Sequence, residues 1–495
     1  MRTIAEMLRW RARRHPSLEA VWFEGKAQTF AALNESSSQL AAGFVHKLGV
    51  ELGDRVCILD KNSAAYFELF FALDKAGVVA APLNWRLTPH EVKQIIDDVK
   101  PKLIVAGPEF KAHGAASGVT TITFDDLPRG GDDPRRDVDG AVSTQFCTSG
   151  TTGLPKGARL TGWNLLNVGF CGALENSEMR EGGRSLVCLP LFHIGGTIWA
   201  IWAMQTGSTV VIVRDPVPEV LVRTMVEQRI ESALLVPTLM LLMTELPQAR
   251  TADFSALKLI SYGTAPISPH LLRRSIETFK CRVLQVYGLT ETTGPFTALS
   301  HEQHVGERLL SCGRPMLGGR VRIVDSDGKD LPPYEVGEIL YQGENLMAGY
   351  WAREEATAQA IRDGWFRTGD AGYVDEEGYI FLKDRIKDMI VSGSENVYPA
   401  EVEAVLMGHP EVLECAVIGV PDAKWGETVK AVVVRRQGTN LTEAALIEWS
   451  RDKLAGFKRP HSVDFIDTLP RNASGKLLKR TLREPYWAGY ARRVN

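Results

Sequence analysis

A short polar segment about one third of the way along the chain has the residue types of a phosphate-binding loop. Thr148-Ser-Gly-Thr-Thr-Gly-Leu-Pro-Lys-Gly157 combines hydroxyl side chains, glycines and a lysine after an apolar approach. Glycines let backbone N–H groups close around an anion, the hydroxyls add donors, and the lysine adds positive charge. It is not a Walker A loop, because Gly157 follows the lysine where a Ser or Thr belongs. We therefore predict a polyphosphate cradle that consists of Thr148, Ser149, Gly150, Thr151, Thr152, Gly153 and Lys156.

A second segment offers groups for the remainder of a nucleotide. Tyr287-Gly-Leu-Thr-Glu291 presents an aromatic face that suits a flat base, a hydroxyl group and a carboxylate. Carboxylate oxygens are hard ligands that suit Mg²⁺, and the carboxylate of Asp370 could accept both hydroxyl groups of a ribose. Each residue also has an ordinary structural alternative: Tyr287 in the core, Glu291 on the surface and Asp370 as the cap of a turn.

The elements that must position these groups alternate between short apolar strands and helices. Buried strands are predicted at residues 55–59, 102–105, 232–236, 257–260 and 283–286. This alternation predicts an α/β fold with largely parallel sheets. The order strand–helix–strand–helix–strand of residues 54–105 returns at residues 185–236, which predicts two similar α/β halves packed side by side. The pattern that all α/β proteins share is the alternative explanation.

The pattern changes near residue 311. Residues 321–341 and 373–381 each have two strand-like runs around a glycine-containing turn, which predicts a small β-barrel-like region at about 311–383. The highly charged residues 383–388 predict an exposed linker. We expect an N-terminal domain at 1–386, whose two α/β subdomains span about 1–310, and a small mobile α+β domain at 387–495.

Composition narrows the functional class. The chain has 495 residues, and 57 Lys and Arg against 60 Asp and Glu give a net charge of −3, which argues against binding nucleic acid through bulk positive charge. Seven dispersed cysteines are typical of reduced thiols in a cytoplasmic protein. The longest apolar runs are too short to span a bilayer. The N-terminal arginines predict a solvated helix face, with weak peripheral contact to anionic lipid as the alternative; they are Arg9, Arg11, Arg13 and Arg14.

The complete set of motifs resembles the adenylate-forming superfamily, which contains acyl- and aryl-CoA ligases, luciferases and the adenylation domains of peptide synthetases. The two segments above are followed in order by Gly364-Trp-Phe-Arg-Thr-Gly-Asp370, Asp384-Arg-Ile-Lys-Asp388, Ser392-Gly-Ser-Glu-Asn-Val-Tyr-Pro399 and Pro470-Arg-Asn-Ala-Ser-Gly-Lys476. Any one of these motifs is weak evidence. Their order is specific, and the resemblance covers nearly the whole chain.

The resemblance implies roles for the nucleotide site. Tyr287 and Gly263 would flank the adenine, with Thr264, Ala265 and Gly288 beside them. Thr290 would contact the α-phosphate, Glu291 and Thr148 would bind Mg²⁺, and Asp370 and Arg385 would hold the ribose. Lys476 would bridge the substrate carboxylate and the α-phosphate during adenylation, since two anions must meet there. Lys387 would be the hinge of the C-terminal domain.

It also implies roles in the acyl and thiol sites. Gly393, Ser394, Glu395 and Trp425 would contact CoA, although Ser394 stands where many relatives have glycine. His193 would be a gate beside the acyl group, with a hydrogen-bonded core histidine as the alternative. The apolar acyl pocket would be lined by Ile194, Gly195, Trp199, Val236 and Met240. His301-Glu-Gln-His304 lacks the spacing of a metal motif and predicts a polar surface loop.

We therefore expect an AMP-forming acid–CoA ligase that uses ATP, Mg²⁺ and CoA. The predominantly apolar acyl segments favour a medium- or long-chain fatty acid or an aromatic acid. The alternatives are an adenylating enzyme that loads a carrier protein, a luciferase-like enzyme and a nucleotide-binding pseudoenzyme that acts as a scaffold. We expect only small-molecule partners and no nucleic acid, with a homodimer as an open alternative.

Overall fold

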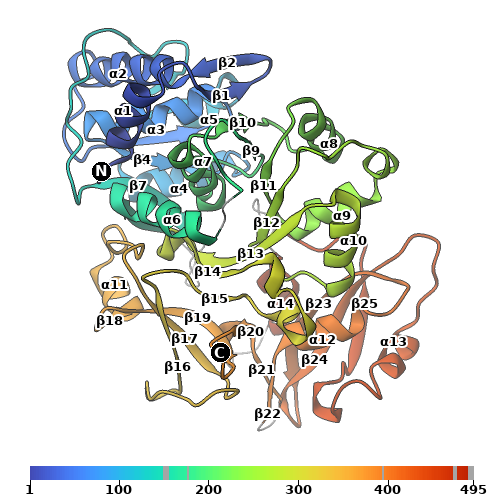
Figure 1. Ribbon diagram of the computed structural model, residues 1–495. Coiled ribbons are helices and arrows are strands. Elements are labelled where there is room, and N and C mark those ends of the chain that lie inside the picture. Colours follow the sequence, from blue (N-terminus) through green and yellow to red (C-terminus); the bar gives the residue numbers. More distant parts are fainter. Residues whose placement is uncertain (149–154, 176–177, 393–394, 472–476, 489–495) are drawn as a thin grey trace. The chain divides into compact units, whose positions relative to one another are not determined.

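In a computed structural model the chain falls into two units of unequal size. The structure describes residues 1–148, 155–175, 178–392, 395–471 and 477–488 (Figure 1). The first unit consists of Met1–Arg320 and Tyr341–Phe366, and the second of Val321–Leu340 and Arg367–Asn495. The chain has an α/β fold.

The first unit contains a six-stranded sheet in the order β6-β5-β3-β4-β7-β8. Its strands are β3 (Arg55–Leu59), β4 (Val79–Pro82), β5 (Leu103–Ala106), β6 (Thr121–Thr123), β7 (Val142–Thr148) and β8 (Lys156–Thr161). Neighbouring strands are parallel except β7 and β8, which form an antiparallel pair. The central strands are buried along almost their whole length, which explains their continuous apolar runs.

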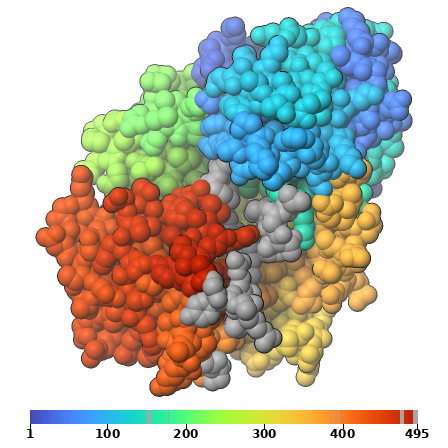
Figure 2. Space-filling view, turned by 180° about the vertical axis from the view of Figure 1, so that it is seen from behind, coloured from blue at the N-terminus to red at the C-terminus, as the bar shows by residue number. Residues whose placement is uncertain are grey.

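A nine-stranded sheet follows in the order β15-β14-β13-β12-β11-β9-β10-β1-β2. Its strands are β1 (Glu19–Phe23), β2 (Lys26–Thr29), β9 (Arg184–Val187), β10 (Thr209–Ile212), β11 (Ser232–Leu235), β12 (Leu259–Gly263), β13 (Arg282–Leu289), β14 (Gly294–Leu299) and β15 (Arg314–Pro315). The order β11-β9-β10 repeats the order β5-β3-β4 of the other sheet, with parallel pairing in both. The predicted internal repeat is thus confirmed, and Figure 2 shows its first half in blue shades and its second half in green.

The first unit also contains helices, most of which connect the strands of these two sheets. They are α1 (Ile4–Arg14), α2 (Phe30–His46), α3 (Ala64–Ala76), α4 (Pro89–Val99), α5 (Lys111–Ala115), α6 (Gly162–Glu175), α7 (Ile194–Thr206), α8 (Pro218–Glu227), α9 (Pro237–Glu245), α10 (Pro269–Phe279) and α11 (Glu354–Ala360). Nearly every residue of α3 and α7 is buried; α7 has no charged residue, whereas α3 buries Glu68, Asp74 and Lys75 among its apolar side chains. These two helices occupy the same position in the two halves of the repeat.

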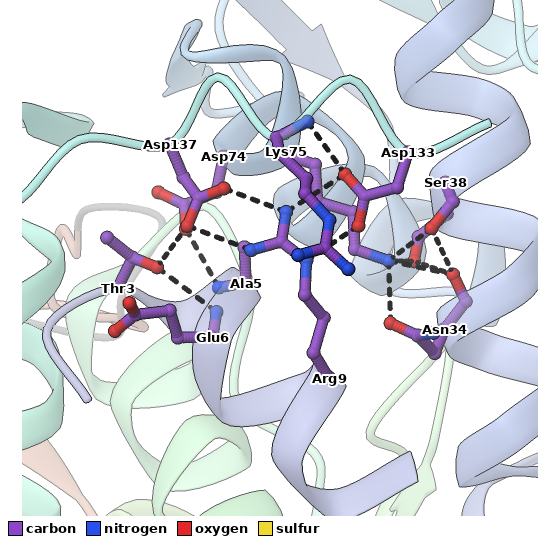
Figure 3. Close-up of polar contacts among 12 residues, drawn as sticks. Thr3, Ala5, Glu6, Arg9, Asn34, Ser38, Asp74, Lys75, Asp133 and Asp137 are labelled. Carbon is purple, nitrogen blue, oxygen red and sulfur yellow. Dashed lines mark hydrogen bonds and ion pairs between the residues drawn. The ribbon is translucent and has the colours of Figure 1, made fainter. Parts of the chain in front are cut away.

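The N-terminal helix α1 corrects one expectation. Thr3 caps it by accepting a hydrogen bond from the Glu6 N–H at 3.1 Å. Arg9 and Arg11 do not lie on a solvated face: Arg11 is buried, and Arg9 pairs with Asp133 and Asp137 (Figure 3). Their partners lie far along the chain, where α1 packs against other parts of the first unit. The prediction of a solvated arginine face is therefore wrong for these two residues.

The second unit confirms the predicted hairpins. It contains most of β16 (Arg320–Val324) and β17 (Gly337–Gln342), and β19 (Trp365–Val374), from Arg367 onward, pairs antiparallel with β20 (Ile380–Arg385). In the first unit, β18 (Ile361–Arg362) pairs with the beginning of β19. Gly378 has a positive φ of 83° in the turn before β20, a conformation that favours glycine.

The remainder of the second unit is a five-stranded sheet with helices. Its strands follow the order β22-β21-β24-β23, and β25 pairs with β24. The elements are β21 (Ile390–Ser392), β22 (Glu395–Val397), β23 (Val412–Asp422), β24 (Gly426–Arg435), β25 (Ser462–Phe465), α12 (Pro399–Leu406), α13 (Glu443–Trp449) and α14 (Lys479–Trp487). Its core includes Val402, Val417, Val429 and Leu446.

The charged residues 383–388 are not an exposed linker. β20 continues to Arg385, and a 3-10 turn, η6 (Ile386–Asp388), follows it. The carboxylate of Asp384 is only 9% exposed; it accepts a hydrogen bond from the Ala400 N–H at 2.9 Å and pairs with Lys479 at 3.5 Å. Asp384, Arg385 and Asp388 are paired within the second unit, and for this reason the expectation of a solvated linker fails for them.

Candidate active site

The hairpin of β7 and β8 forms the base of the predicted phosphate loop. Thr148 and Lys156 are paired across the two strands, and the Thr148 hydroxyl donates a hydrogen bond to the Lys156 carbonyl at 3.3 Å. Five predicted cradle residues between these two strands lie outside the described part of the chain: Ser149, Gly150, Thr151, Thr152 and Gly153. The hairpin therefore fixes the position of Lys156 at the end of a strand.

Lys156, Tyr350 and Glu291 lie next to one another. The Lys156 ammonium is 5.2 Å from the centre of the Tyr350 ring, and the Tyr350 hydroxyl donates a 2.8 Å hydrogen bond to Oε1 of Glu291. Burial and the adjacent Glu291 carboxylate raise the pKa of Tyr350, so the phenol is a neutral donor. The structure thus brings together two predicted site residues through a third that the sequence analysis missed.

Backbone contacts hold this group in place. Tyr350 forms an isolated antiparallel bridge with Ala158 of β8, and the Trp351 N–H donates to the Gly157 carbonyl at 2.8 Å. The Met347 N–H donates to the Glu291 carbonyl, also at 2.8 Å. The segment 347–351 therefore bridges β8 and the 3-10 turn η3 (Thr290–Thr292), which carries Thr290 and Glu291.

The predicted adenine residues lie at the ends of β12 and β13. Gly263 pairs with Val286, and a Cβ on Gly263 would lie 2.2 Å from the Val286 carbonyl oxygen. A Cβ on Gly288 would lie 1.9 Å from the Gly294 carbonyl oxygen. Strand packing therefore requires both glycines independently of any ligand. Tyr287 packs 4.9 Å from the Phe296 ring, and Thr264, which precedes Ala265, has a strained φ of 67°.

Asp370 and Arg385 face each other in the second unit. They are register partners in β19 and β20, and their side chains form an ion pair at 2.5 Å. Asp370 is nearly buried, whereas Arg385 is about one third exposed. The backbone N–H of Asp370 donates to the Thr368 hydroxyl at 3.1 Å. The structure therefore holds these two predicted ribose residues together.

His193 is the N-cap of α7. Its Nδ1 accepts a hydrogen bond from the Gly195 N–H at 3.4 Å. The loop before it is fixed by Asn62, a buried residue that the sequence analysis missed. The Asn62 amide donates to the carbonyls of Leu189 at 2.9 Å and Val213 at 3.4 Å, and accepts from the Leu191 N–H at 2.8 Å. Asn62 follows β3, so one half of the repeat positions a loop of the other half.

The other predicted acyl residues lie in or beside the core of the first unit. Ile194, Trp199 and Met240 are buried, and the Trp199 indole donates to the Leu186 carbonyl at 3.1 Å. Gly195 lies in the first turn of α7, and Val236 precedes α9. All of these positions are apolar, and their role in binding an acid stays a prediction.

The predicted thiol-site residues are only partly described. Trp425 is 43% exposed in the turn between β23 and β24, with the Lys424 ammonium 4.5 Å from its ring centre. Glu395 is exposed in β22. Gly393, Ser394 and Lys476 lie outside the described residues, and the Lys387 backbone lies in η6. The hinge and thiol roles remain predictions.

The His301-Glu-Gln-His304 segment is less exposed than expected. His304 is half-buried, and its Nε2 lies 2.8 Å from the Tyr262 hydroxyl and its Nδ1 2.7 Å from the Ser300 carbonyl. Burial lowers the pKa of His304. The expectation of a surface loop is therefore wrong for His304. Among the described residues, no group of three or more His, Cys, Asp or Glu side chains is arranged to hold a metal. That part of the chain also lacks a helix with the length and apolar character needed to cross a membrane.

Comparison with known proteins finds matches along the whole chain. The family model described as AMP-binding enzyme matches residues 8–351, and the model described as AMP-binding enzyme C-terminal domain matches residues 401–476. The fatty acid–[acyl-carrier-protein] ligase ScoC of Streptomyces coeruleorubidus is 38% identical over 100% of this chain and 98% of its own length. A feruloyl-CoA synthase from an Amycolatopsis species is 39% identical over 96% and 97%.

A solved structure is also similar to this chain over nearly its whole length. The o-succinylbenzoate CoA synthetase of Bacillus subtilis, in complex with ATP and magnesium ion, has a TM-score of 0.87 and 32% identity, with 96% of this chain and 98% of that chain covered. Both the sequence and the fold of this chain are therefore similar to these proteins over nearly its whole length.

Proposed function

The chain belongs to the AMP-binding enzyme family, and from this premise we propose that it is an ATP-dependent acid–CoA ligase for carboxylic acids with an apolar tail. At the coarser level it is an adenylate-forming acid–thiol ligase that uses ATP, Mg²⁺ and CoA. The observation that carries the proposal is the group around Tyr350, where a cation and a carboxylate lie at the base of the phosphate loop.

The first half-reaction would activate the acid. A carboxylate is a poor electrophile, so its oxygen attacks the α-phosphorus of ATP, a new P–O bond forms, and the bond to pyrophosphate breaks. Lys156 would neutralise phosphate charge, and Lys476 would lie between the carboxylate and the α-phosphate. Thr290 would donate to an α-phosphate oxygen. Asp370 and Arg385 would hold the ribose side of the nucleotide.

Glu291 and Thr148 have side chains that suit a magnesium ion bound together with ATP. Oε1 of Glu291 accepts from Tyr350, while Oε2 has no hydrogen-bond or ion-pair partner among the described residues. Glu291 is partly exposed, and a carboxylate oxygen of this kind suits a hard divalent cation. We propose that Glu291 holds the ion together with Thr148. Bound there, Mg²⁺ would withdraw charge from the phosphate oxygens.

The second half-reaction would transfer the acyl group. The CoA thiolate attacks the acyl carbonyl, a thioester forms, and AMP leaves. We propose that domain 387–495 rotates about Lys387 relative to domain 1–386, which withdraws Lys476 and brings Gly393, Ser394 and Glu395 to the site. Trp425 would contact CoA through its exposed indole.

The residues around the predicted acyl site support an apolar tail. Ile194, Trp199, Val236 and Met240 carry no charge, and His193 at the N-cap of α7 is the one ionisable group in the set. An apolar lining without a cation disfavours amino acids and dicarboxylates. Relatives that act on a fatty acid and on ferulic acid lend support to fatty and aromatic acids as the two substrate classes.

A carrier protein is the second candidate for the acyl acceptor. The observation in its favour is the 38% identity to a fatty acid–[acyl-carrier-protein] ligase over the whole chain. Such an enzyme would share the adenylation half-reaction and differ only in the thiol it accepts. Transfer of the acyl group from purified acyl-AMP to CoA or to a phosphopantetheinylated carrier protein separates the two.

Adenylation is tested by pyrophosphate exchange and by hydroxamate trapping over a panel of saturated fatty acids and aryl acids. We expect exchange that depends on both ATP and Mg²⁺, with the highest kcat/KM for an acid with an apolar tail. Trp199→Ala and Met240→Ala should shift the preference gradually, since one methylene is worth only about 1–3 kcal/mol. Equal rates for amino acids or dicarboxylates would refute the substrate class, and no exchange with any acid would refute the activity.

A further inference from the structure

The Lys156 and Glu291 side chains lie on opposite parts of Tyr350 and form no ion pair with each other. The ammonium faces the ring, at 5.2 Å from its centre, and the carboxylate accepts from the hydroxyl at 2.8 Å. Within the described part of the chain, the Lys156 ammonium has no hydrogen-bond or ion-pair partner. There, Tyr350 is the one hydrogen-bond partner of the Glu291 side chain. Tyr350 itself is only 8% exposed.

The absence of an ion pair between Lys156 and Glu291 leaves both charges available for a ligand. A lysine and a glutamate in one partly buried site attract each other strongly, because the effective dielectric constant there is far below that of water. A direct ion pair would neutralise both groups, and it would have to break before phosphate and a divalent cation could bind. A neutral side chain that contacts both groups prevents this pairing and also orients each of them.

We propose that Tyr350 is a positioning residue that keeps Lys156 available for the phosphates and Glu291 available for the divalent cation. This inference rests on the proposed function. The ring attracts the ammonium through a cation–π interaction. The hydroxyl fixes one oxygen of Glu291 and leaves the other directed to a ligand. The two parts of one side chain thus serve two opposite charges.

The backbone around Tyr350 supports this role. Tyr350 bridges Ala158, two residues from Lys156 in β8, while the Met347 N–H binds the Glu291 carbonyl at 2.8 Å. A Cβ on the preceding Gly349, where φ is 117°, would lie 2.8 Å from Thr357. The segment is therefore fixed both to β8, which carries Lys156, and to η3, which carries Glu291, so the Tyr350 side chain has little freedom to move away from them.

Two substitutions separate the two contacts. Tyr350→Phe keeps the ring and removes the hydrogen bond to Glu291, whereas Tyr350→Leu removes both. Binding of ATP is measured by titration calorimetry in EDTA and at a series of Mg²⁺ concentrations, so that the readout does not depend on turnover. Tyr486→Phe is the matched control, because it removes another phenol–carboxylate hydrogen bond, to Asp464 in the second unit.

We expect Tyr350→Phe to bind ATP in EDTA like the wild-type protein and to need about tenfold more Mg²⁺ for the same gain in affinity, since a hydrogen bond to a charged group is lost. Tyr350→Leu should also bind ATP less well in EDTA, because Lys156 then pairs with Glu291. Adding Glu291→Gln to Tyr350→Leu should restore ATP binding in EDTA. The control should match the wild type in both conditions.

The inference is overturned if Tyr350→Phe keeps the wild-type Mg²⁺ dependence. It is also overturned if Glu291→Gln fails to restore binding in the Tyr350→Leu background, because a purely structural role predicts a uniform loss that no charge change repairs. Wild-type protein that binds no ATP would instead refute the proposed function, and this inference with it.

Discussion

Arg9 should contribute more to stability than an ordinary arginine of the N-terminal helix. Its guanidinium donates to both oxygens of Asp133 at 2.6 and 2.9 Å and to both oxygens of Asp137 at 3.0 and 2.7 Å (Figure 3). The Thr3 hydroxyl also donates to Asp137, at 2.8 Å. The two aspartates belong to the irregular segment between β6 and β7, so these bonds attach that segment to α1. Arg9→Leu removes all four guanidinium bonds.

The expected loss of stability in Arg9→Leu follows from the burial of the three charged side chains. The side chains of Arg9, Asp133 and Asp137 are 13%, 16% and 6% exposed, so solvent screens their charges only weakly. Removing one partner of a buried ion pair leaves an uncompensated charge and costs about 3–5 kcal/mol. At about 2 °C per kcal/mol, the lower end of the range because the first unit is large, the unfolding midpoint should fall by roughly 6–10 °C.

Thermal unfolding followed by intrinsic fluorescence at one fixed scan rate measures this effect. Arg13→Leu is the matched control, since Arg13 lies on the same helix and is exposed, and it should change the midpoint by less than about 2 °C. Adding Asp133→Asn and Asp137→Asn to Arg9→Leu should recover part of the loss. A midpoint for Arg9→Leu that equals that of Arg13→Leu would refute the reasoning.

The cluster of Arg9, Asp133 and Asp137 also predicts how the destabilisation by Arg9→Leu changes as the pH falls. Burial alone would raise the pKa of Asp133, but the hydrogen bonds and charge of Arg9 outweigh it and lower the pKa. A carboxyl whose pKa is lowered on folding contributes stability above its unfolded value, and this stability is lost as the pH falls through the folded value. Below about pH 4, the difference between the wild type and Arg9→Leu should therefore shrink.

Three further predictions concern the buried Lys75, the proposed ATP and Mg²⁺ residues Lys156 and Glu291, and the proposed roles of Lys476 and Lys387. Burial lowers the pKa of Lys75 from 10.5 to about 7, so the unfolded chain binds more protons between these values, and stability in urea should rise from about pH 7 to 10; Lys75→Met should abolish this rise, and an unchanged slope would contradict the assignment. Lys156→Ala and Glu291→Ala should weaken use of MgATP without lowering the unfolding midpoint, and unchanged kinetics for ATP in both would remove them from the site. Lys476→Ala should reduce pyrophosphate exchange by about 10²–10³ while thioester formation from acyl-AMP survives. Lys387→Pro should do the reverse because proline fixes φ; equal loss of both half-reactions in either variant would exclude a two-conformation mechanism.

Periodicity and turn chemistry predict the parts of this fold that depend on local sequence. The strands β3, β5 and β11 were evident because parallel strands buried on both faces need continuous apolar runs. The repeat could be recognised for the same reason, since each half must bury the same kinds of faces. The turn at Gly378 was evident because a positive φ there favours glycine.

Contacts between distant segments could not be predicted in this way. Arg9 and Asp133 are 124 residues apart, and nothing in an Arg-rich helix indicates that one arginine is buried against an aspartate. Asp384 looked like part of a charged linker because its partner Lys479 lies 95 residues further along. Tyr350 in Met-Ala-Gly-Tyr350-Trp carries no local sign of a charged neighbour. Paired charges thus look like solvated charges until the fold brings their partners together.

Different side chains hold the proposed nucleotide site and the proposed acid site in position. The group that would face the nucleotide, Lys156 and Glu291, is held by Tyr350 and the segment 347–351. The loop that carries His193 is held by Asn62, through three hydrogen bonds to backbone groups after β9 and β10. Because no described side chain serves both supports, we expect substitutions around the His193 loop to leave the positions of Lys156 and Glu291 unchanged. If the His193 loop lies beside the acid as proposed, this separation would allow related enzymes to differ in the acid, as the names of two relatives 38–39% identical to the chain do.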